Sequence, residues 1–162
     1  MSDRKVLVEN MSKATVTLIF NNTNFKRNLK GEGAKVYIPF EVLYEGLSEP
    51  GVQVMFDKGI LRINDKKDRV DLGLEFEDEV VVANSMSSNE MLIILKENNP
   101  IKIKETLEGL AENQRIKFAQ VAIENDIYSA GLAKFIKDYT DIDLLKAMQE
   151  YKAEQEDAAE IR

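Results

Sequence analysis

The ionisable side chains of this chain that could do chemistry are mainly carboxylates, because its 162 residues include no histidine and no cysteine. Without these residue types, histidine-dependent triads, thiol nucleophiles, disulfides and zinc sites built on them cannot form. Carboxylate chemistry and cations held by oxygen ligands alone remain open. We therefore expect no enzymatic activity, no metal and no cofactor.

The densest acidic cluster consists of Glu75, Glu77, Asp78 and Glu79. Such carboxylates could hold Mg²⁺ or meet a basic partner. No second carboxylate group is recognisably positioned opposite, so a metal site is not predicted. The four residues are candidate partner contacts, and an exposed linker is the alternative.

A second group of carboxylates, Asp65, Asp68 and Asp71, alternates with lysine and arginine. The spacing lacks the glycine and the terminal glutamate of an EF-hand calcium loop. We expect a solvated turn here.

Basic and aromatic side chains come together in the first half of the chain. Lys26, Arg27, Lys30 and Lys35 lie near Phe25 and Tyr37 in sequence. A sheet that interleaves such residues can bind single-stranded nucleic acid. The net charge of −7 disfavours contact with phosphates, so we predict a solvated face and no nucleic-acid partner.

Aromatic residues and a methionine also mark the second half: Tyr128, Phe135, Tyr139, Met148 and Tyr151. Large side chains of this kind anchor many protein interfaces, and they also fill small helical cores. We take Tyr128 and Tyr139 as further candidate partner contacts.

The elements that position these residues differ between the two halves. Alternating, β-branched stretches predict strands over residues 15–20, 25–29, 35–39 and 60–63, and Pro39 should lie at a strand end or a sheet edge. Apolar spacing predicts short helices over 40–47 and 52–58. The segment from Met1 to Met11 is a polar lead-in with a short apolar patch at residues 6–8.

From Ser87 onward the apolar period is helical. Ser87 and Glu90 form a capping box before a helix over 91–96. Further helices are predicted over 101–110, 112–124 and 129–138, and a last one opens at Thr140-Asp141. In the third of these five helices, Ile116, Ala119 and Ile123 are expected to face the core. Residues 152–162 are polar and are expected to fray.

A boundary near Val82 to Ser88 follows from this change of period. We predict a β-rich domain over residues 1–84 with a short helix, and a helical domain over 85–162 with a polar end. No apolar run is long enough to span a membrane, and Met1 to Glu9 has no signal-peptide character.

The order of these features resembles a largely uncharacterised family of small tailed-bacteriophage proteins, over about residues 14 to 151. The matching segments are Thr15–Phe20, Phe25–Leu29, Gly31–Val36, Ile38–Leu43 with Leu47, Pro50-Gly51, Leu61–Asn64 and Lys137–Ala147. The stretch from Lys66 to Val82 departs from the pattern. The resemblance implies a place among phage structural genes and supplies no catalytic residues.

We therefore expect an α+β protein: a small N-terminal β sandwich or partial barrel, followed by a bundle of four or five short helices. The expected function is that of a phage-encoded, non-enzymatic virion or assembly protein that contacts capsid, portal or tail components. A phage inhibitor of a host enzyme or defence protein is the alternative. The expected location is the host cytoplasm, with incorporation into the virion and homo-oligomer formation left open, and no membrane partner is expected.

Overall fold

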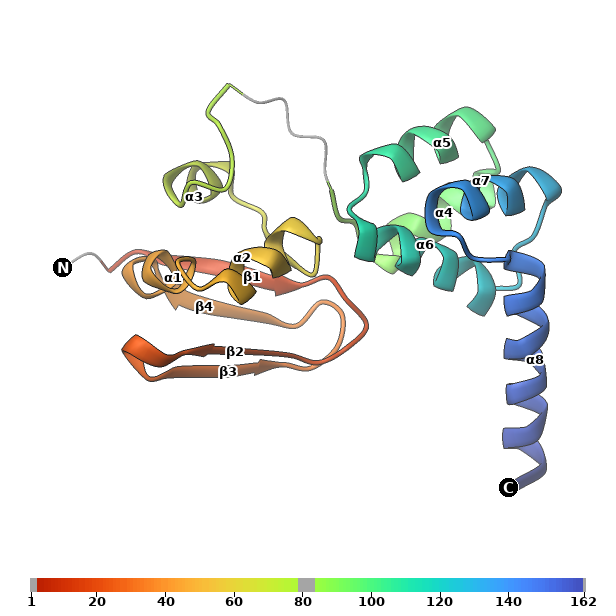
Figure 1. The fold of residues 1–162 in the computed structure, drawn as a ribbon, viewed down its shortest axis with the longest axis horizontal. Helices are drawn as coiled ribbons and strands as arrows, with labels where there is room; N and C mark the ends of the chain where they lie inside the picture. Colours follow the sequence, from red (N-terminus) through yellow and green to blue (C-terminus); the bar gives the residue numbers. More distant parts are fainter. Residues whose placement is uncertain (1–2, 79–83, 162) are drawn as a thin grey trace. The chain divides into compact units, whose positions relative to one another are not determined.

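The computed structural model describes residues 3–78 and 84–161. These residues form five β-strands, one 3-10 turn and eight α-helices, so the fold class is α+β as predicted. The chain divides into two compact units, Met1–Ser85 (unit 1) and Met86–Arg162 (unit 2), each with an apolar core. Figure 1 shows the strands and three helices of unit 1 and the five helices of unit 2.

The strands of unit 1 form two small antiparallel sheets. The first has β1 (Lys5–Asn10) at its centre, flanked by β4 (Lys35–Pro39) and β5 (Leu61–Ile63). The second is a hairpin of β2 (Val16–Phe20) and β3 (Phe25–Leu29), joined through a 3-10 turn. The expected sandwich is not shown, and no barrel closes within residues 3–78 and 84–161.

Strand β1 was missed by the sequence analysis, which described this segment as a polar lead-in with a short apolar patch. Its apolar run is short, but Val6 and Val8 are fully buried and pair with Ile38 and Val36 of β4. Strand β4 lies at a sheet edge and Pro39 is its last residue, which confirms the predicted place of this proline.

Three helices complete unit 1: α1 (Phe40–Gly46), α2 (Pro50–Asp57) and α3 (Lys66–Asp71). Gly46 of α1 is buried against the ring of Phe20, where an added Cβ would lie 2.8 Å from the nearest ring atom. Only glycine allows this close approach. The core of unit 1 joins both sheets to the helices. Its buried members are Val6, Val8, Val16, Leu18, Phe20, Leu29, Ile38, Leu43, Val52, Phe56, Leu61, Ile63 and Leu72.

Helix α3 replaces the solvated turn predicted around the aspartates. The side chain of Asp65 caps the helix by accepting from the backbone N–H groups of Lys67 at 2.8 Å and Asp68 at 3.4 Å. Arg4, near the start of the chain, forms ion pairs with Asp68 and, at 2.9 Å, with Asp71. Hydrogen bonds to Asp68 and then to Asp71 raise the pKa of Arg4. Asp68 and Asp71 therefore hold Arg4 against α3.

Unit 2 consists of α4 (Ser88–Glu97), α5 (Pro100–Gly109), α6 (Glu112–Glu124), α7 (Ala130–Thr140) and α8 (Leu144–Ile161). Ser87 caps α4 by accepting from the backbone N–H of Glu90 at 3.2 Å, which confirms the first half of the predicted capping box. Helix α6 packs against α4, α7 and α8. Its core face is built on Phe118, Val121 and Ala122.

The predicted core face of α6 was therefore wrong for Ile116, which is 37% exposed. Helix α6 has neighbours on several sides, so even Gln114 and Lys117 are buried. A single apolar stripe does not identify the buried face of such a central helix.

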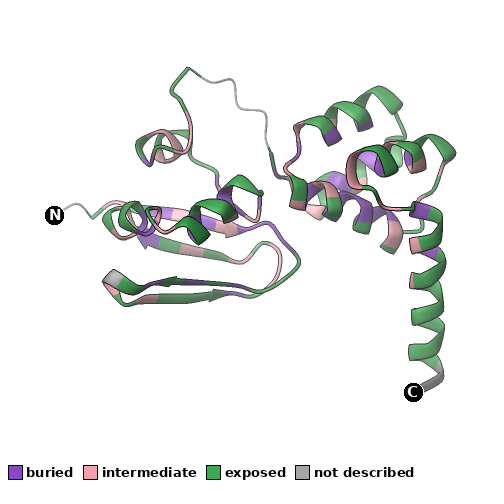
Figure 2. Ribbon diagram, in the orientation of Figure 1, coloured by how far each residue is buried: buried purple, intermediate pink, exposed green. Residues whose placement is uncertain are grey.

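Helix α8 packs on α6 and α7. Leu144 and Met148 are buried, whereas every residue from Lys152 to Ala159 is exposed. Figure 2 shows the exposed part as a green helix that runs away from the rest of unit 2. Within the described ranges, no helix has both the length and the apolar character needed to cross a membrane.

Candidate protein-binding surface

The predicted acidic cluster is not brought together as one site. Glu75 forms an ion pair with Arg69 at 3.0 Å, and its side chain is only 7% exposed. Arg69 also donates to the carbonyl oxygens of Ile63 at 2.7 Å and Asn64 at 2.8 Å, at the end of β5. Glu75 therefore has a structural partner and fastens the segment after α3 to the sheet.

The other members of the cluster lie on the surface or outside the described residues. Glu77 and Asp78 are exposed, and the neighbouring Phe76 has an exposed fraction of 73%. Glu79 lies outside the described residues. Two exposed carboxylates beside an exposed ring remain as candidate contacts in this segment.

The two tyrosines predicted as contacts both belong to unit 2 and differ in their environment. Tyr128 is 47% exposed. Tyr139 is partly buried, and its hydroxyl donates to Glu108 at 2.8 Å, while the guanidinium of Arg115 lies over its ring at 5.5 Å. The hydrogen bond to Glu108 raises the pKa of Tyr139, since loss of the phenolic proton would place two negative charges side by side. Tyr128 is thus the more accessible of the two.

One hollow, of about 210 Å³, is lined by Phe40, Glu41, Tyr44 and Glu45, all from helix α1. Within residues 3–78 and 84–161, no three carboxylates lie close enough together to hold a metal ion.

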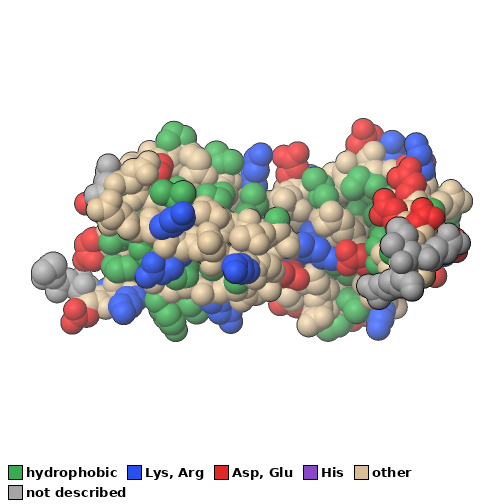
Figure 3. Space-filling view, turned by 90° about the horizontal axis from the view of Figure 1, so that it is seen from below, with side chains coloured by type: hydrophobic (Ala, Val, Ile, Leu, Met, Phe, Trp, Pro, Cys, Tyr) green, Lys and Arg blue, Asp and Glu red, His purple; other side chains and the backbone are tan. Residues whose placement is uncertain are grey.

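The strongest charge feature of unit 1 is a positive surface on the β2–β3 hairpin. Residues 10–39 contain five basic residues and one acidic residue, a local net charge of +4 in a chain of net charge −7. Lys26, Arg27 and Lys30 are all exposed. Lys26 and Lys30 are four residues apart and follow the spacing of one strand face, and we call these two residues the basic hairpin surface. In Figure 3, Lys and Arg side chains are spread over this side of unit 1. No ion pair joins them to a carboxylate in the described part of the chain.

The strand register determines how these cations are presented. Lys26 pairs with Ile19 across the hairpin, and both point away from the core because Leu18 and Phe20 are buried. Ile19 is 47% exposed, so an apolar side chain lies beside Lys26 on the outward face. By the two-residue period of a strand, Asn28 lies on the same face. This face combines positive charge with a small apolar area.

A buried asparagine assembles the far end of the hairpin. The Asn10 side chain donates to the carbonyl oxygens of Ala14 at 2.7 Å, Leu29 at 3.1 Å and Gly31 at 3.0 Å. Because one amide binds all three, the chain next to Lys13 lies beside the chain at Lys30. Sequence reasoning missed this grouping. Its only signal was an asparagine two positions after the apolar run of β1 and directly before Met11.

The aromatic side chain next to these cations is already engaged. The Phe25 ring stacks on Phe20 with centroids 5.3 Å apart, and the Arg27 guanidinium lies 5.1 Å from its centroid. Nucleic-acid bases need an open ring face for stacking. Tyr37 is 64% exposed, but it belongs to β4 of the other sheet.

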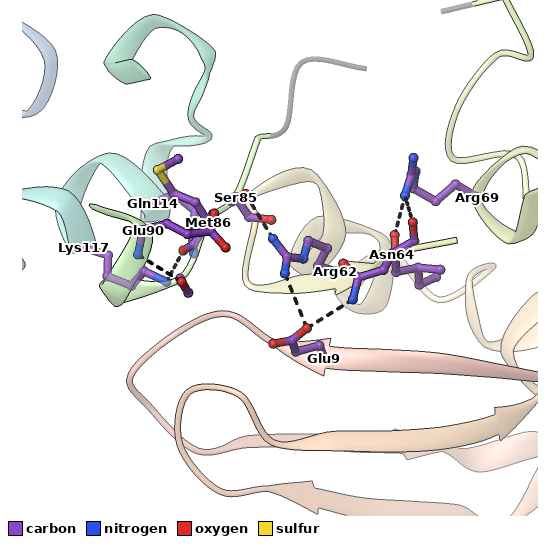
Figure 4. A network of polar contacts seen from close by, with 11 residues as sticks. Glu9, Arg62, Asn64, Arg69, Ser85, Met86, Glu90, Gln114 and Lys117 are labelled. Atoms are coloured by element: carbon purple, nitrogen blue, oxygen red, sulfur yellow. Dashed lines mark hydrogen bonds and ion pairs between the residues drawn. The ribbon is translucent and has the colours of Figure 1, made fainter. Parts of the chain in front are cut away.

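Lys35 is in a different environment from the hairpin cations. It pairs in register with Glu9 of β1. Glu9 in turn accepts from Arg62 at 3.5 Å and Asn64 at 3.3 Å, as Figure 4 shows. We therefore leave Lys35 out of the basic hairpin surface, since a carboxylate lies beside it.

Polar contacts also fix the first residue of unit 2. The backbone N–H of Met86 donates to Gln114 at 3.1 Å, and Lys117 donates to the Met86 carbonyl oxygen at 2.7 Å (Figure 4). Both side chains come from α6 and are buried. Lys117 thus has a structural role, which explains a charged residue in this core.

No protein-family model matches the chain, and no curated protein or solved structure matches it either.

Proposed function

We propose that this protein is a non-enzymatic binding protein that contacts an acidic protein surface through the basic hairpin surface. The observation that carries this proposal is the exposed, unpaired cluster of Lys26 and Lys30 in an otherwise acidic chain. Ile19 beside Lys26 adds the small apolar area that protein interfaces combine with charge. Such a surface favours an acidic protein by electrostatic complementarity.

A protein partner is favoured over nucleic acid for two reasons. The Phe25 ring is engaged by Phe20 and Arg27, so it offers no open face for a base. The net charge of −7 also repels those phosphates of a nucleic acid that do not lie against the hairpin cations.

The biological setting that we propose is phage assembly, with capsid, portal or tail proteins as partners. This part rests on the sequence resemblance over about residues 14 to 151 and on the absence of histidine and cysteine from the sequence. The test is mass spectrometry of purified particles of a phage that encodes the chain. Its presence in the particles at constant stoichiometry is expected, and its absence would overturn a virion role.

The surface itself is tested by binding to poly-L-glutamate, with single-stranded DNA of about twenty nucleotides as the comparison. We expect polyglutamate to bind the wild type and to bind a variant with Lys26→Glu and Lys30→Glu about tenfold more weakly or worse. A double variant with Glu41→Lys and Glu45→Lys on α1 is the control. Tighter binding to the DNA, lost in the lysine variant, would refute a protein partner in favour of nucleic acid.

A further inference from the structure

Helix α8 is longer than its packing in unit 2 requires. It spans 18 residues, yet among residues 144–159, whose burial is described, only Leu144 and Met148 in its first turns are buried in the core. Every residue from Lys152 to Ala159 is exposed. Helices in proteins gain most of their stability from packing an apolar face, and a helix that is polar all round needs another source of stability.

The charges of α8 oppose an isolated helix. Glu154, Glu156 and Asp157 lie in its C-terminal half, where the helix dipole disfavours negative charge, and its last turn contains no basic residue. Glu150 and Glu154 are also like charges four residues apart, which weakens a free helix. A cationic surface beside the helix would offset both effects.

The acidic side chains are arranged for such a contact. Glu150, Glu154 and Asp157 follow the spacing of one helix face and span about 10 Å. Glu150 lies about 160° around the helix from the buried Met148, so the acidic face points away from the bundle. Lys152 differs from the acidic side chains, because it is paired with Asp126 at 3.0 Å.

The basic hairpin surface matches this acidic face in charge and length. Lys26 and Lys30 are four residues apart, about 13 Å along an extended chain, and Ile19 lies beside Lys26. Both surfaces are exposed in the single chain.

We infer that the acidic face of α8 from one copy binds the basic hairpin surface of a second copy. This inference rests on the proposed function and names its partner as another copy of the same chain. The contact joins different surfaces of the two copies, so each pair keeps one free hairpin and one free α8. Further copies can then add head to tail.

The experiment is sedimentation velocity of the full chain at about 50 mM and about 500 mM NaCl, across a concentration series. We expect species larger than the monomer at low salt and their loss at high salt. A variant with Glu150→Lys and Glu154→Lys should associate about tenfold more weakly or worse, as should the variant with Lys26→Glu and Lys30→Glu. Combining all four changes restores opposite charges and should restore association. Far-UV circular dichroism verifies that each variant is folded.

The matched control is Glu41→Lys with Glu45→Lys, which reverses two exposed charges four residues apart on α1 and should leave association unchanged. A wild type that stays monomeric at every concentration overturns the inference. The inference is also overturned if the protein is monomeric and the Lys26→Glu, Lys30→Glu variant changes the hydrogen exchange of α8, because the contact would then lie within one chain. If polyglutamate still binds the hairpin of a monomeric wild type, the proposed function stands and the self-association fails. If polyglutamate does not bind, the proposed function itself fails.

Discussion

Asn10 should be the most sensitive polar residue of unit 1. Its side chain is fully buried and makes five hydrogen-bonding contacts: its two amide N–H groups are shared among three carbonyl oxygens, and its oxygen accepts from the backbone N–H and the hydroxyl of Ser12, both at 2.9 Å. The bonds to Leu29 and Ser12 are buried, whereas the bonds to the Ala14 and Gly31 carbonyl oxygens are only partly buried and therefore partly accessible to water.

The change Asn10→Ala removes all five contacts. Each is worth about 1 kcal/mol net, and a buried group left unpaired costs about 1–3 kcal/mol. Because water can reach two of the carbonyl oxygens, we expect the free energy of unfolding of unit 1 to fall by about 3–5 kcal/mol. Asn10→Asp has nearly the same shape but turns a carboxylate toward three carbonyl oxygens. The loss in the free energy of unfolding caused by Asn10→Asp should be larger at neutral pH than in acid, because the protonated carboxyl group can donate a hydrogen bond.

The assay is urea unfolding combined with hydrogen exchange measured by mass spectrometry, which reports on the two units separately. Protection should fall throughout the strands of unit 1 and stay unchanged in unit 2. The control is Asn28→Ala, since Asn28 is exposed and bonded to Thr17 on the surface at 2.8 Å, and it should cost less than about 1 kcal/mol. A loss for Asn10→Ala no larger than that of the control would refute the reasoning.

Three further changes test other parts of the structure. Gly46→Ala should destabilise unit 1 by about 1–2 kcal/mol in urea unfolding, because the added methyl group meets a buried aromatic ring; unchanged stability would contradict this packing. Arg69→Ala should cost about 2–4 kcal/mol in the same assay and more than Glu75→Gln, because it leaves a largely buried carboxylate without its partner. Glu108→Gln should lower the pKa of Tyr139, measured by phenolate absorbance in a variant whose other tyrosines are phenylalanine. The hydrogen bond stabilises the fold fully below pH about 10, the usual pKa of tyrosine, and this stabilisation is lost as the pH rises through the raised pKa of Tyr139. Equal pKa values of Tyr139 in the wild type and the variant would exclude the bond.

Local patterns in the sequence were sufficient for the elements that are stabilised locally. The alternation over residues 15–20 and 25–29 predicted both hairpin strands, and helix α6 begins and ends where predicted. The Ser87 cap was also identified, because a cap depends on residues only three positions apart.

Elements that depend on distant partners were missed. Strand β1 has a short apolar run, and its outward Glu9 meets Arg62, which is 53 residues away. Helix α3 is held by ion pairs to Arg4, which no local pattern reveals. The same limit applies to the candidate site: Glu75 is neutralised by Arg69, and the grouping of Lys13 with Lys30 depends on the buried Asn10.

The central position of β1 also determines when unit 1 can fold. Strand β1 is the first element of the chain, yet its two neighbours are residues 35–39 and 61–63. Pairings between such distant segments form late, because the chain between them must first be ordered. During synthesis β1 therefore stays unpaired until β4 and then β5 have left the ribosome, whereas β2 can pair with β3 as soon as the hairpin is complete. Deleting the first ten residues would leave β4 and β5 without the strand that joins them.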